Sequence, residues 1–541
     1  MRVISPAADL ELTLGDPLNP RAPISFAALV EHDEREAAPA EAFEALRQWG
    51  VHAHLVPKAL GGHLESLEDL LALVRVVSRR DLVLTTGLGS TMLAAIPVWA
   101  WGSDDQRRQV ADLLLGQGAF GSFAVSERNA GSDFAATITR ADEADGGYLL
   151  FGEKWLIGNA SRSSFVVALA RTGRSLSLVY LRPNQLPAAA LRRLPRIPTL
   201  GLRGHDLGGL AFADCRLPPG ALLEPAGRGM EMALTTLHYT RTMVAGMALG
   251  AADTALRLAL GWGCSRRLYG ESILAIPAVR ALLLGAFLDI LIGECLAIIA
   301  ARALTFAPRR ASLWTAVTKY LVPKLCERVV RDAATVLSAR SYLREGVAGG
   351  VFQKIARDVP IAGIFEGTSL VQLSLIESQL VQLKKTGRRD PELVDLDRLG
   401  DLGSPAPYWD PVKTRLRVGD PGGDELVERW FGQAEDPGAG PRVTAALQSL
   451  QRNQRMSQLA AHHHCVMHAA ACCVQVWRSS RYSLAPEARG AEWLSLCLER
   501  LAGGSDSAPG GADLNGSDFA WMLGQLDRGE LFSLTALELA R

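Results

Sequence analysis

The sequence predicts a multidomain α and β protein, with a helical domain, an antiparallel β-domain, a four-helix bundle and a helical extension in that order. Apolar residues recur at helical spacing before residue 116 and again after residue 222. Between them, residues alternate with a period of two and glycines stand at the corners, which is typical of an antiparallel meander. The 541 residues suffice for about three or four domains.

The composition is that of a soluble globular protein, 48% hydrophobic and 21% charged. The 57 basic and 57 acidic residues balance, so charge gives no reason to expect nucleic acid or an anionic membrane as partner. Residues 1–16 lack the apolar core of a signal peptide. The most apolar stretch, residues 281–307, contains three charges and is expected to be a buried helix, not a membrane span.

The eight cysteines lie mostly inside helical patterns and include no CxxC pair. We expect them to be reduced core residues of a cytoplasmic protein.

We assign residues 24–115 to the N-terminal helical domain. Helical spacing covers residues 26–49, 67–78 and 87–101, and Ser103 is expected to cap the next helix. Three histidines without ligand spacing follow the first helix and are expected at the surface: His52, His54 and His63.

We assign residues 116–222 to the β-domain. Small polar residues follow its first strand, and they allow the polar edge of a ligand to approach the backbone closely: Ser126, Gly131 and Ser132. Strands are expected at residues 120–125, 148–151, 165–170, 176–181 and 209–213.

Residues 223–385 are predicted to form an antiparallel four-helix bundle, with helices at 229–260, 279–306, 312–338 and 369–384. Residues 386–541 comprise a linker rich in Gly, Pro and Asp and a helical C-terminal extension. Helical patterns of the extension cover residues 424–431, 443–479, 492–501 and 519–539. The Gly/Ser/Asp-rich segment 503–516 is expected to be mobile.

Four short motifs stand in order in the β-domain: Val125-Ser126-Glu127, Ala130-Gly131-Ser132-Asp133, Gly152-Glu153-Lys154 and Ile157-Gly158-Asn159. They resemble the central domain of the acyl-CoA dehydrogenase flavoproteins, whose pattern is V-T-E-x-x-A-G-S-D followed by G-x-K-x-W-I-T-N. The order of helical, β and bundle segments is also the family's, so the resemblance covers roughly residues 24–385. It implies an FAD-dependent oxidoreductase of fatty acid metabolism that acts on an acyl thioester.

The segment Ile364-Phe365-Glu366-Gly367-Thr368 resembles the Y-E-G-T motif of that family and lies eight residues after Arg357-Asp358, as the family's R-D does. The resemblance implies that Glu366 takes the α-proton, that flavin N5 accepts the β-hydride, and that the backbone N–H of Glu366 holds the thioester oxygen. A carboxylate in a dry pocket has a raised pKa, which suits a general base. The alternative is that Glu366 is a charge at a helix N-terminus before Ser369.

Some family members carry the base on the first bundle helix, one residue before an arginine. Here that position is Thr240, before Arg241, and a threonine cannot serve as a base at neutral pH. Glu366 is therefore the only base that the resemblance offers. Arg241 is expected either near the substrate or in a salt bridge of the bundle.

The resemblance also assigns cofactor contacts. Ser126 replaces the threonine that binds the flavin ring, and Ser132 matches the serine near the pyrophosphate and the thioester. Arg266 and Tyr269 lie in a segment similar to E-R-x-x-F-G, where the arginine binds the pyrophosphate across a subunit interface. Alternatively, Arg266 belongs to a solvated helix face. The predicted cofactor-binding set is Phe123, Val125, Ser126, Ser132, Leu156, Ile157, Gly158, Arg266, Tyr269 and Thr368; the predicted substrate-binding set is Ser132, Arg241 and Gly367.

These assignments imply a homodimer or homotetramer, with an electron-transfer flavoprotein as a candidate partner. The chain departs from the family at Leu156 and Gly158 beside the flavin ring, and at Pro277, Ser338 and Ala339 near the adenine half. Because the I-G-N ending is similar to acyl-CoA oxidases, an oxidase is an alternative. A non-catalytic binding or assembly protein is another. Acyl chain length, and CoA or acyl carrier protein as the carrier, stay open.

His464 and His468 have the i,i+4 spacing of a two-histidine metal site, beside His462, His463 and Cys465. No third ligand is apparent in the sequence, so we expect helix packing and no metal.

Overall fold

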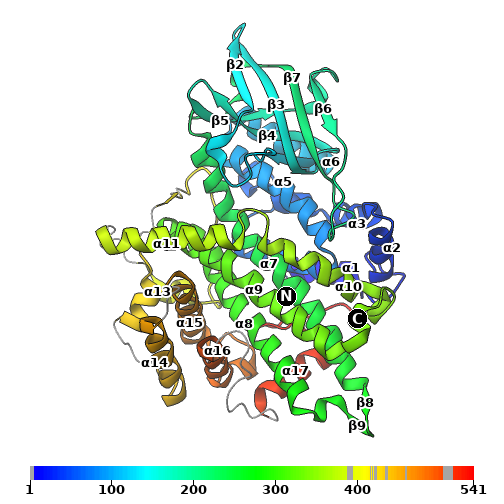
Figure 1. Cartoon of the computed structure of the whole chain (residues 1–541), viewed down its shortest axis with the longest axis vertical. Coiled ribbons are helices and arrows are strands. Elements are labelled where there is room, and N and C mark those ends of the chain that lie inside the picture. The colour runs from blue at the N-terminus through cyan, green and yellow to red at the C-terminus, as the bar shows by residue number, and fades with distance from the viewer. Residues whose placement is uncertain are drawn as a thin grey trace.

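A computed structural model describes residues 5–386, 394–414, 416, 418–419, 423–432, 437–456, 460–503 and 516–541. The β-domain forms one end of the molecule, and the long helices of the bundle form its centre (Figure 1). The C-terminal helices pack against one side of the bundle (Figure 1).

The N-terminal helices are α1 (Pro6–Leu14), α2 (Phe26–Glu34), α3 (Ala40–Trp49), α4 (Leu67–Arg80), α5 (Leu82–Trp101) and α6 (Asp104–Gln117). The single helix predicted over residues 26–49 is wrong: α2 ends at Glu34, Glu36 has a left-handed φ of 52°, and Pro39 is the N-cap of α3. The cap at Ser103 is confirmed: its side chain and that of Gln106 form a capping box at α6.

The surface position predicted for three histidines is correct only for His63. His52 is 4% exposed, and His54 is half-buried with its ring stacked on that of Trp49 at 4.8 Å. Both lie in the short 3-10 helix η1 (Val51–Leu55), which continues directly from α3 and faces the core.

The sheet contains β1 (Phe120–Ala124), β2 (Arg140–Ala144), β3 (Gly147–Gly158), β4 (Ser163–Thr172), β5 (Ser175–Leu181), β6 (Leu191–Leu194) and β7 (Leu207–Leu217). Its order is β1-β4-β2-β3-β7-β6, with β5 paired to β4. The prediction of a purely antiparallel meander is wrong, because β1 runs parallel to β4 with Phe123 opposite Val167. The β2–β3 hairpin separates these two strands along the chain, so no tight turn forces them to be antiparallel. The pieces predicted on either side of Gly152 form one strand, β3, with a register shift there.

The bundle contains α7 (Gly229–Ser265), α8 (Pro277–Phe306), α9 (Ala311–Leu337) and α11 (Ser369–Thr386), with the shorter α10 (Val351–Asp358) before the last of them. Within the described residues, three helices are long and apolar enough to cross a membrane by length and composition: α5, α7 and α8. Between 78% and 89% of their apolar windows is buried inside the fold, so here they are core helices.

The extension contains α12 (Leu396–Gly400), α13 (Glu425–Val427), α14 (Pro441–Met456), α15 (Ala460–Ser480), α16 (Glu492–Gly503) and α17 (Ser517–Arg528). The pattern over residues 443–479 corresponds to α14 and α15, with residues 457–459 outside the described part. Residues 504–515, which are most of the segment predicted to be mobile, also lie outside the described part. The helix predicted over 519–539 ends at Arg528, because Gly529 has a left-handed φ of 61°.

All eight cysteines are free thiols, and seven are buried as expected. Cys264, at the end of α7, is the exposed exception.

The tail after α17 inserts among the helices and is held by buried charges. The Phe532 N–H donates to Asp253 Oδ2 at 2.9 Å, and the Leu534 N–H donates to Glu294 Oε2 at 2.9 Å. Arg75 pairs with Glu294 at 2.7 Å and also donates to the Phe532 carbonyl oxygen at 2.6 Å. These partners satisfy charges that would otherwise be costly to bury.

We expect Phe532→Ala to lower the melting temperature measured by calorimetry. The Phe532 ring is fully buried, in edge contact with Phe287, so truncation removes about 3 kcal/mol of packing or more. The control Tyr482→Ala removes a ring that is 77% exposed and should change the stability by less than about 0.5 kcal/mol. Equal melting temperatures for Phe532→Ala and the wild type would contradict this account of the tail.

Candidate active site

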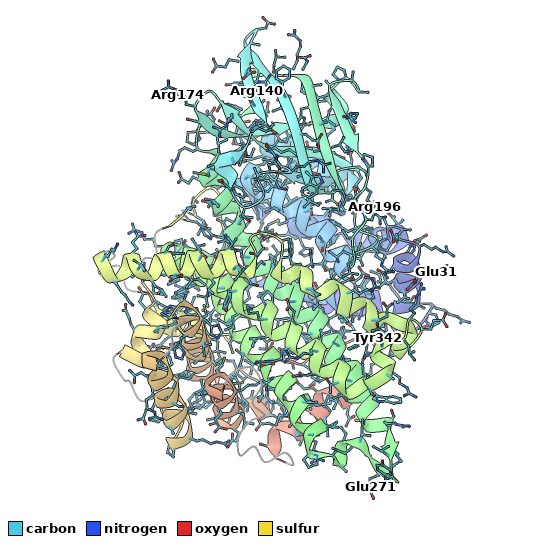
Figure 2. All side chains as sticks on the ribbon, viewed as in Figure 1. Glu31, Arg140, Arg174, Arg196, Glu271 and Tyr342 are labelled. Atoms are coloured by element: carbon cyan, nitrogen blue, oxygen red, sulfur yellow. The ribbon has the colours of Figure 1, made fainter. Side chains whose placement is uncertain are left out.

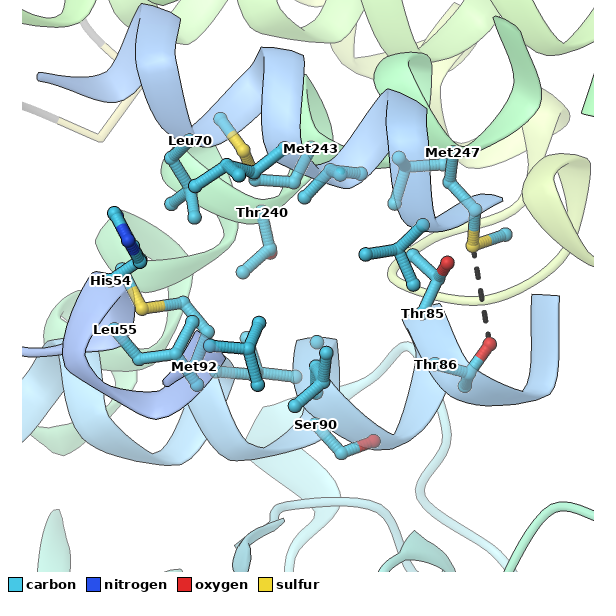
Figure 3. Close-up of a pocket in the computed structure, with 18 of the residues that line it drawn as sticks. His54, Leu55, Leu70, Thr85, Thr86, Ser90, Met92, Thr240, Met243 and Met247 are labelled. Carbon is cyan, nitrogen blue, oxygen red and sulfur yellow. Dashed lines mark hydrogen bonds between the residues drawn. The ribbon is translucent and has the colours of Figure 1, made fainter. Parts of the chain in front are cut away.

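An apolar cavity of about 100 Å³ lies between the N-terminal helices and the bundle. Figure 3 shows Met243 and Met247 of α7 along one wall, Met92 and Ser90 of α5 along the opposite wall, and His54 at one end. Leucines and valines of α4 complete the lining. Such a cavity fits an extended hydrocarbon chain, because few of its atoms can hydrogen-bond a polar ligand.

Glu366 stands in the wall of this cavity next to Phe365. Its Oε2 atom is buried and has no hydrogen-bond partner among the described residues, and the same is true of the Thr240 hydroxyl, which also lines the cavity. Burial raises the pKa of Glu366, while the charges of Lys319 and Arg241 partly oppose the rise. The structure thus brings a carboxylate with a free oxygen to an apolar space.

The loop that carries Glu366 is strained and anchored. Glu366 has a φ of 57°, in the left-handed region that non-glycine residues rarely adopt. The Gln372 amide of α11 donates to the carbonyl oxygens of Glu366 and Gly367, both at 3.3 Å. Lys319 of α9 donates to the Ala362 carbonyl oxygen at 2.6 Å.

Arg241 is 4% exposed and lies 3.4 Å from His238 Nδ1. It forms no salt bridge within the described ranges, so the bundle salt bridge weighed for it is wrong. Burial lowers the pKa of Arg241 to about 10, and the charge of Glu366 opposes this change. His238 is buried too, and its pKa is well below the usual value because burial disfavours the imidazolium.

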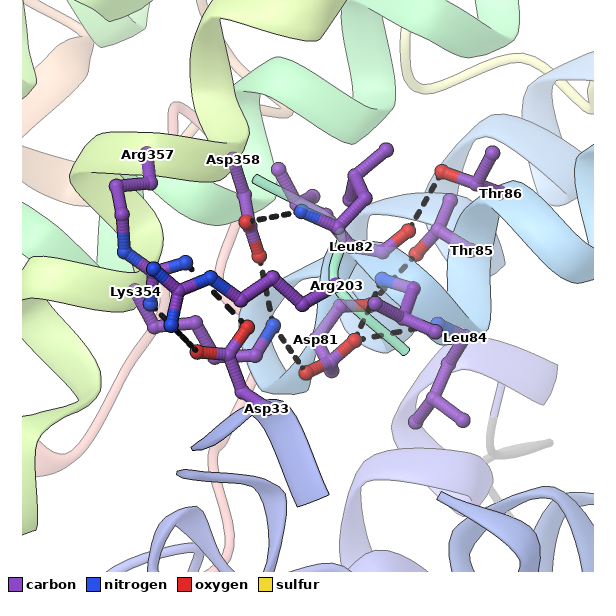
Figure 4. A network of polar contacts seen from close by, with 12 residues as sticks. Asp33, Asp81, Leu82, Leu84, Thr85, Thr86, Arg203, Lys354, Arg357 and Asp358 are labelled. Carbon is purple, nitrogen blue, oxygen red and sulfur yellow. Dashed lines mark hydrogen bonds and ion pairs between the residues drawn. The ribbon is translucent and has the colours of Figure 1, made fainter. Parts of the chain in front are cut away.

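The segment Arg357-Asp358 fastens the chain before Glu366 to the wall of the cavity (Figure 4). Lys354 pairs with Asp358 at 2.6 Å and with Asp81, the N-cap of α5, at 2.7 Å. Arg357 pairs with Asp33 of α2 at 2.5 Å. These contacts join α10 to α5 and α2, so the cavity wall and the loop of Glu366 keep a fixed relation.

The end of β3 approaches the cavity from the other side of α5. A Cβ atom at Gly158 would stand 2.3 Å from Ser90 Oγ and 3.2 Å from His205 Nε2. The space of a side chain at 158 is therefore occupied by Ser90, which lines the cavity. This explains why glycine replaces the threonine that the resemblance predicts there.

The other residues predicted to bind the ring of the cofactor differ in what they can offer. Ser126 Oγ donates to the Trp155 carbonyl oxygen at 2.8 Å. Leu156 has a φ of 58° and is 41% exposed, whereas three side chains of the predicted set are buried and leave only their backbone to a ligand: Phe123, Val125 and Ile157.

Residues assigned to the far half of the cofactor do not meet the cavity within one chain. Arg266 and Tyr269 lie at the hairpin of β8 (Arg267–Leu268) and β9 (Glu271–Ser272), at the opposite end of the molecule from the sheet (Figure 1). Tyr269 is 97% exposed. Ser132 and Thr368 are exposed as well, and Gly367 is half-buried with a left-handed φ of 93°. Ser338, at a position where the resemblance has a glycine, has a positive φ of 56°, a value that favours glycine.

These features fit an FAD ring at the junction of β3 and the cavity. Leu156 offers an exposed apolar surface, and the half-buried Ser126 hydroxyl, which donates to the Trp155 carbonyl oxygen, can still accept a hydrogen bond. A flavin-binding site needs both an apolar surface against the ring and polar groups at the edge of the ring.

The histidine-rich helix α15 contains a cluster that sequence reasoning missed. His464 Nε2 and His468 Nδ1 both lie 2.8 Å from Asp424 Oδ2, far away along the chain. The pKa of Asp424 is lowered because the two histidines outweigh its burial. Among the described residues no group of three His, Cys, Asp or Glu side chains could hold a metal ion.

Three family models match the chain in order: the acyl-CoA dehydrogenase N-terminal domain over residues 26–115, the middle domain over 122–215 and the C-terminal domain over 227–381. Together with the fold and the site, they show that the chain belongs to the acyl-CoA dehydrogenase family, whose members are FAD-dependent oxidoreductases.

Among similar proteins, short-chain specific acyl-CoA dehydrogenase of Sus scrofa is 30% identical over 53% of this chain and 69% of its own. The probable acyl-CoA dehydrogenase FadE25 of Mycobacterium tuberculosis is 28% identical over 65% of this chain and 90% of its own. The structure of acyl-CoA dehydrogenase complexed with FAD from Bacillus anthracis aligns with 96% of this chain and 90% of its own, at a TM-score of 0.70 and 16% identity. That fold therefore includes the C-terminal extension.

We expect Gly158→Thr to lower the melting temperature and to weaken FAD retention, because the new side chain must displace Ser90 and separate α5 from β3. The double variant Ser90→Gly/Gly158→Thr should recover both properties in part. Gly220→Thr is the control, since a Cβ there meets no atom within 4 Å. Thermal melting and the flavin absorbance of purified protein measure the effect. A Gly158→Thr protein as stable and as yellow as the wild type would refute the steric account.

Proposed function

We propose that this protein is an FAD-dependent acyl-CoA dehydrogenase that desaturates acyl thioesters between Cα and Cβ, with Glu366 as the base that takes the α-proton. The observation that carries the proposal is the buried, unpaired Oε2 of Glu366 in the wall of an apolar cavity. An acyl chain in that cavity would lie beside the carboxylate. FAD, when bound, supplies the acceptor for the β-hydride.

The chain's own residues account for the acid–base part of the reaction. The raised pKa of Glu366 makes its carboxylate a stronger base than an exposed one. The apolar lining keeps water away from the α-carbon. The backbone N–H of Glu366 is proposed to hold the thioester oxygen, so that negative charge developing there is stabilised. Arg241 keeps a positive charge close to this carboxylate.

The cofactor contacts proposed from the sequence divide between two subunits. Ser126, Leu156 and Thr368 are proposed to contact the flavin ring, while Arg266 and Tyr269 would contact the cofactor of a second copy. Their exposure on a projecting hairpin supports a homo-oligomer, as does Tyr342, which is 92% exposed and labelled at the surface in Figure 2. We propose an electron-transfer flavoprotein as the electron acceptor and the cytoplasm as the location.

We expect Gly89→Leu to shorten the acyl site. Gly89 lines the cavity, and a Cβ there meets no atom within 4 Å, so the added side chain would occupy the space of the acyl chain. The kcat/KM for the longest good substrate should fall about tenfold or more, while short thioesters are affected less. Gly261→Leu, at a similarly open glycine of α7 outside the cavity, is the control. An equal loss for every chain length would argue against this cavity as the acyl site.

We expect Glu366→Gln to retain FAD but to lose flavin bleaching by acyl-CoA under anaerobic conditions, by at least about 10²-fold in rate, because glutamine cannot take the proton. Bleaching at the wild-type rate would exclude Glu366 as the base. A wild-type protein that turns over in air with peroxide release, and without an electron-transfer partner, would identify an oxidase.

A further inference from the structure

Lys319 is a buried cation in contact with the loop that carries Glu366. No sequence motif singles this lysine out. It lies in the middle of α9 and is fully buried. Its Nζ donates to the Ala362 carbonyl oxygen at 2.6 Å and lies 3.5 Å from the Gly367 carbonyl oxygen. Its ammonium group also stands 5.6 Å from the centre of the Phe365 ring. One side chain therefore contacts the loop both before and after Glu366.

We propose that Lys319 is a positioning residue for the base: it tethers the loop of residues 362–367 and keeps a positive charge beside the Glu366 carboxylate. The inference rests on the proposed role of Glu366. A tether is needed there because Glu366 holds a left-handed φ of 57°, and an unsupported loop would relax from it. Gln372 holds the outer side of the same loop through the carbonyl oxygens of Glu366 and Gly367, so Lys319 and Gln372 act from two helices.

The charge of Lys319 has a second effect. A carboxylate in an apolar cavity would have its pKa raised by burial alone, and the positive charges of Lys319 and Arg241 limit that rise. Without them, a larger fraction of Glu366 would be protonated at neutral pH and unable to accept the α-proton. Burial lowers the pKa of Lys319 itself to about 8, which leaves the ammonium charged in the neutral range.

The other titratable groups near this pair come from α7 and α9. His238 is neutral at ordinary pH because burial lowers its pKa, and Arg241 stays charged. Glu327 of α9 influences Lys319, and its pKa is raised mainly by burial. None of these groups donates to the Ala362 or Gly367 carbonyl oxygen in the described structure, so among the described titratable groups Lys319 alone tethers the loop through these oxygens.

Two substitutions separate the tether from the charge. Lys319→Gln keeps an N–H donor but removes the charge, and Lys319→Met removes both. Lys324→Met is the matched control, because it removes an exposed lysine of the same helix. The full-length, FAD-loaded proteins are compared by the pH dependence of kcat/KM, and by hydrogen–deuterium exchange of residues 362–368 without substrate.

The acidic limb of the pH profile of kcat/KM should shift to higher pH by about one unit in Lys319→Gln and Lys319→Met, because Glu366 loses a neighbouring positive charge. Deuterium exchange of residues 362–368 should rise in Lys319→Met and much less in Lys319→Gln. Lys324→Met should match the wild type in both. An acidic limb that moves in neither variant, together with wild-type exchange of residues 362–368 in a folded Lys319→Met, would overturn the proposal. If acyl-CoA still bleaches the flavin of Glu366→Gln, the assignment of Glu366 as the base fails. The deuterium exchange data still test the tether in that case.

Discussion

The burial of one carboxylate in the wall of an apolar cavity constrains the rest of this structure. Glu366 lies at a strained loop, so its position depends on supports from several helices. Lys319 and Gln372 hold the loop itself. Before Glu366 in the chain, Lys354 pairs with both Asp358 and Asp81 at the start of α5. The helix that forms one cavity wall is therefore fixed to the segment that leads to Glu366. The same contacts therefore support both the apolar cavity and the Glu366 carboxylate in its wall.

Buried charge pairs serve a similar purpose away from the site. Glu294 of α8 accepts from the backbone of the C-terminal tail and pairs with Arg75 of α4. Asp289 pairs with Arg500 of α16 at 2.7 Å, which connects the bundle to the extension. Such pairs cost much to bury and are favourable only with precise geometry, so they favour one arrangement of the helices over others.

The sequence predicted the parts of this account that depend on local patterns. The E-G-T motif identified Glu366 before any geometry, and helical periodicity located the bundle. The sequence did not predict the role of Ser90, because a serine in an apolar helix belongs to no motif. Its role depends on the contact with Gly158, which is far away along the chain. The parallel pairing of β1 with β4 and the inserted tail are long-range contacts that no local pattern encodes. Lys319 had only a weak signal, a lysine among mostly apolar residues in a helix that also carries Lys324.

The departures from the family pattern have physical explanations in part. Ser90 occupies the space that a threonine at 158 would need, and Ser338 has a positive φ, a value that favours glycine. Pro277 occupies the first position of α8, where proline is favourable because its missing N–H and fixed φ suit a helix start.

The most direct test of the central claim separates proton abstraction from the redox step. An acyl thioester with an oxygen or sulfur at the β-position has no β-hydrogen to lose, so only its α-protons can exchange in D₂O. We predict that the FAD-loaded wild type incorporates deuterium at Cα, measured by NMR, and that Glu366→Gln does not. Deuterium incorporation by Glu366→Gln at the wild-type rate would contradict the account.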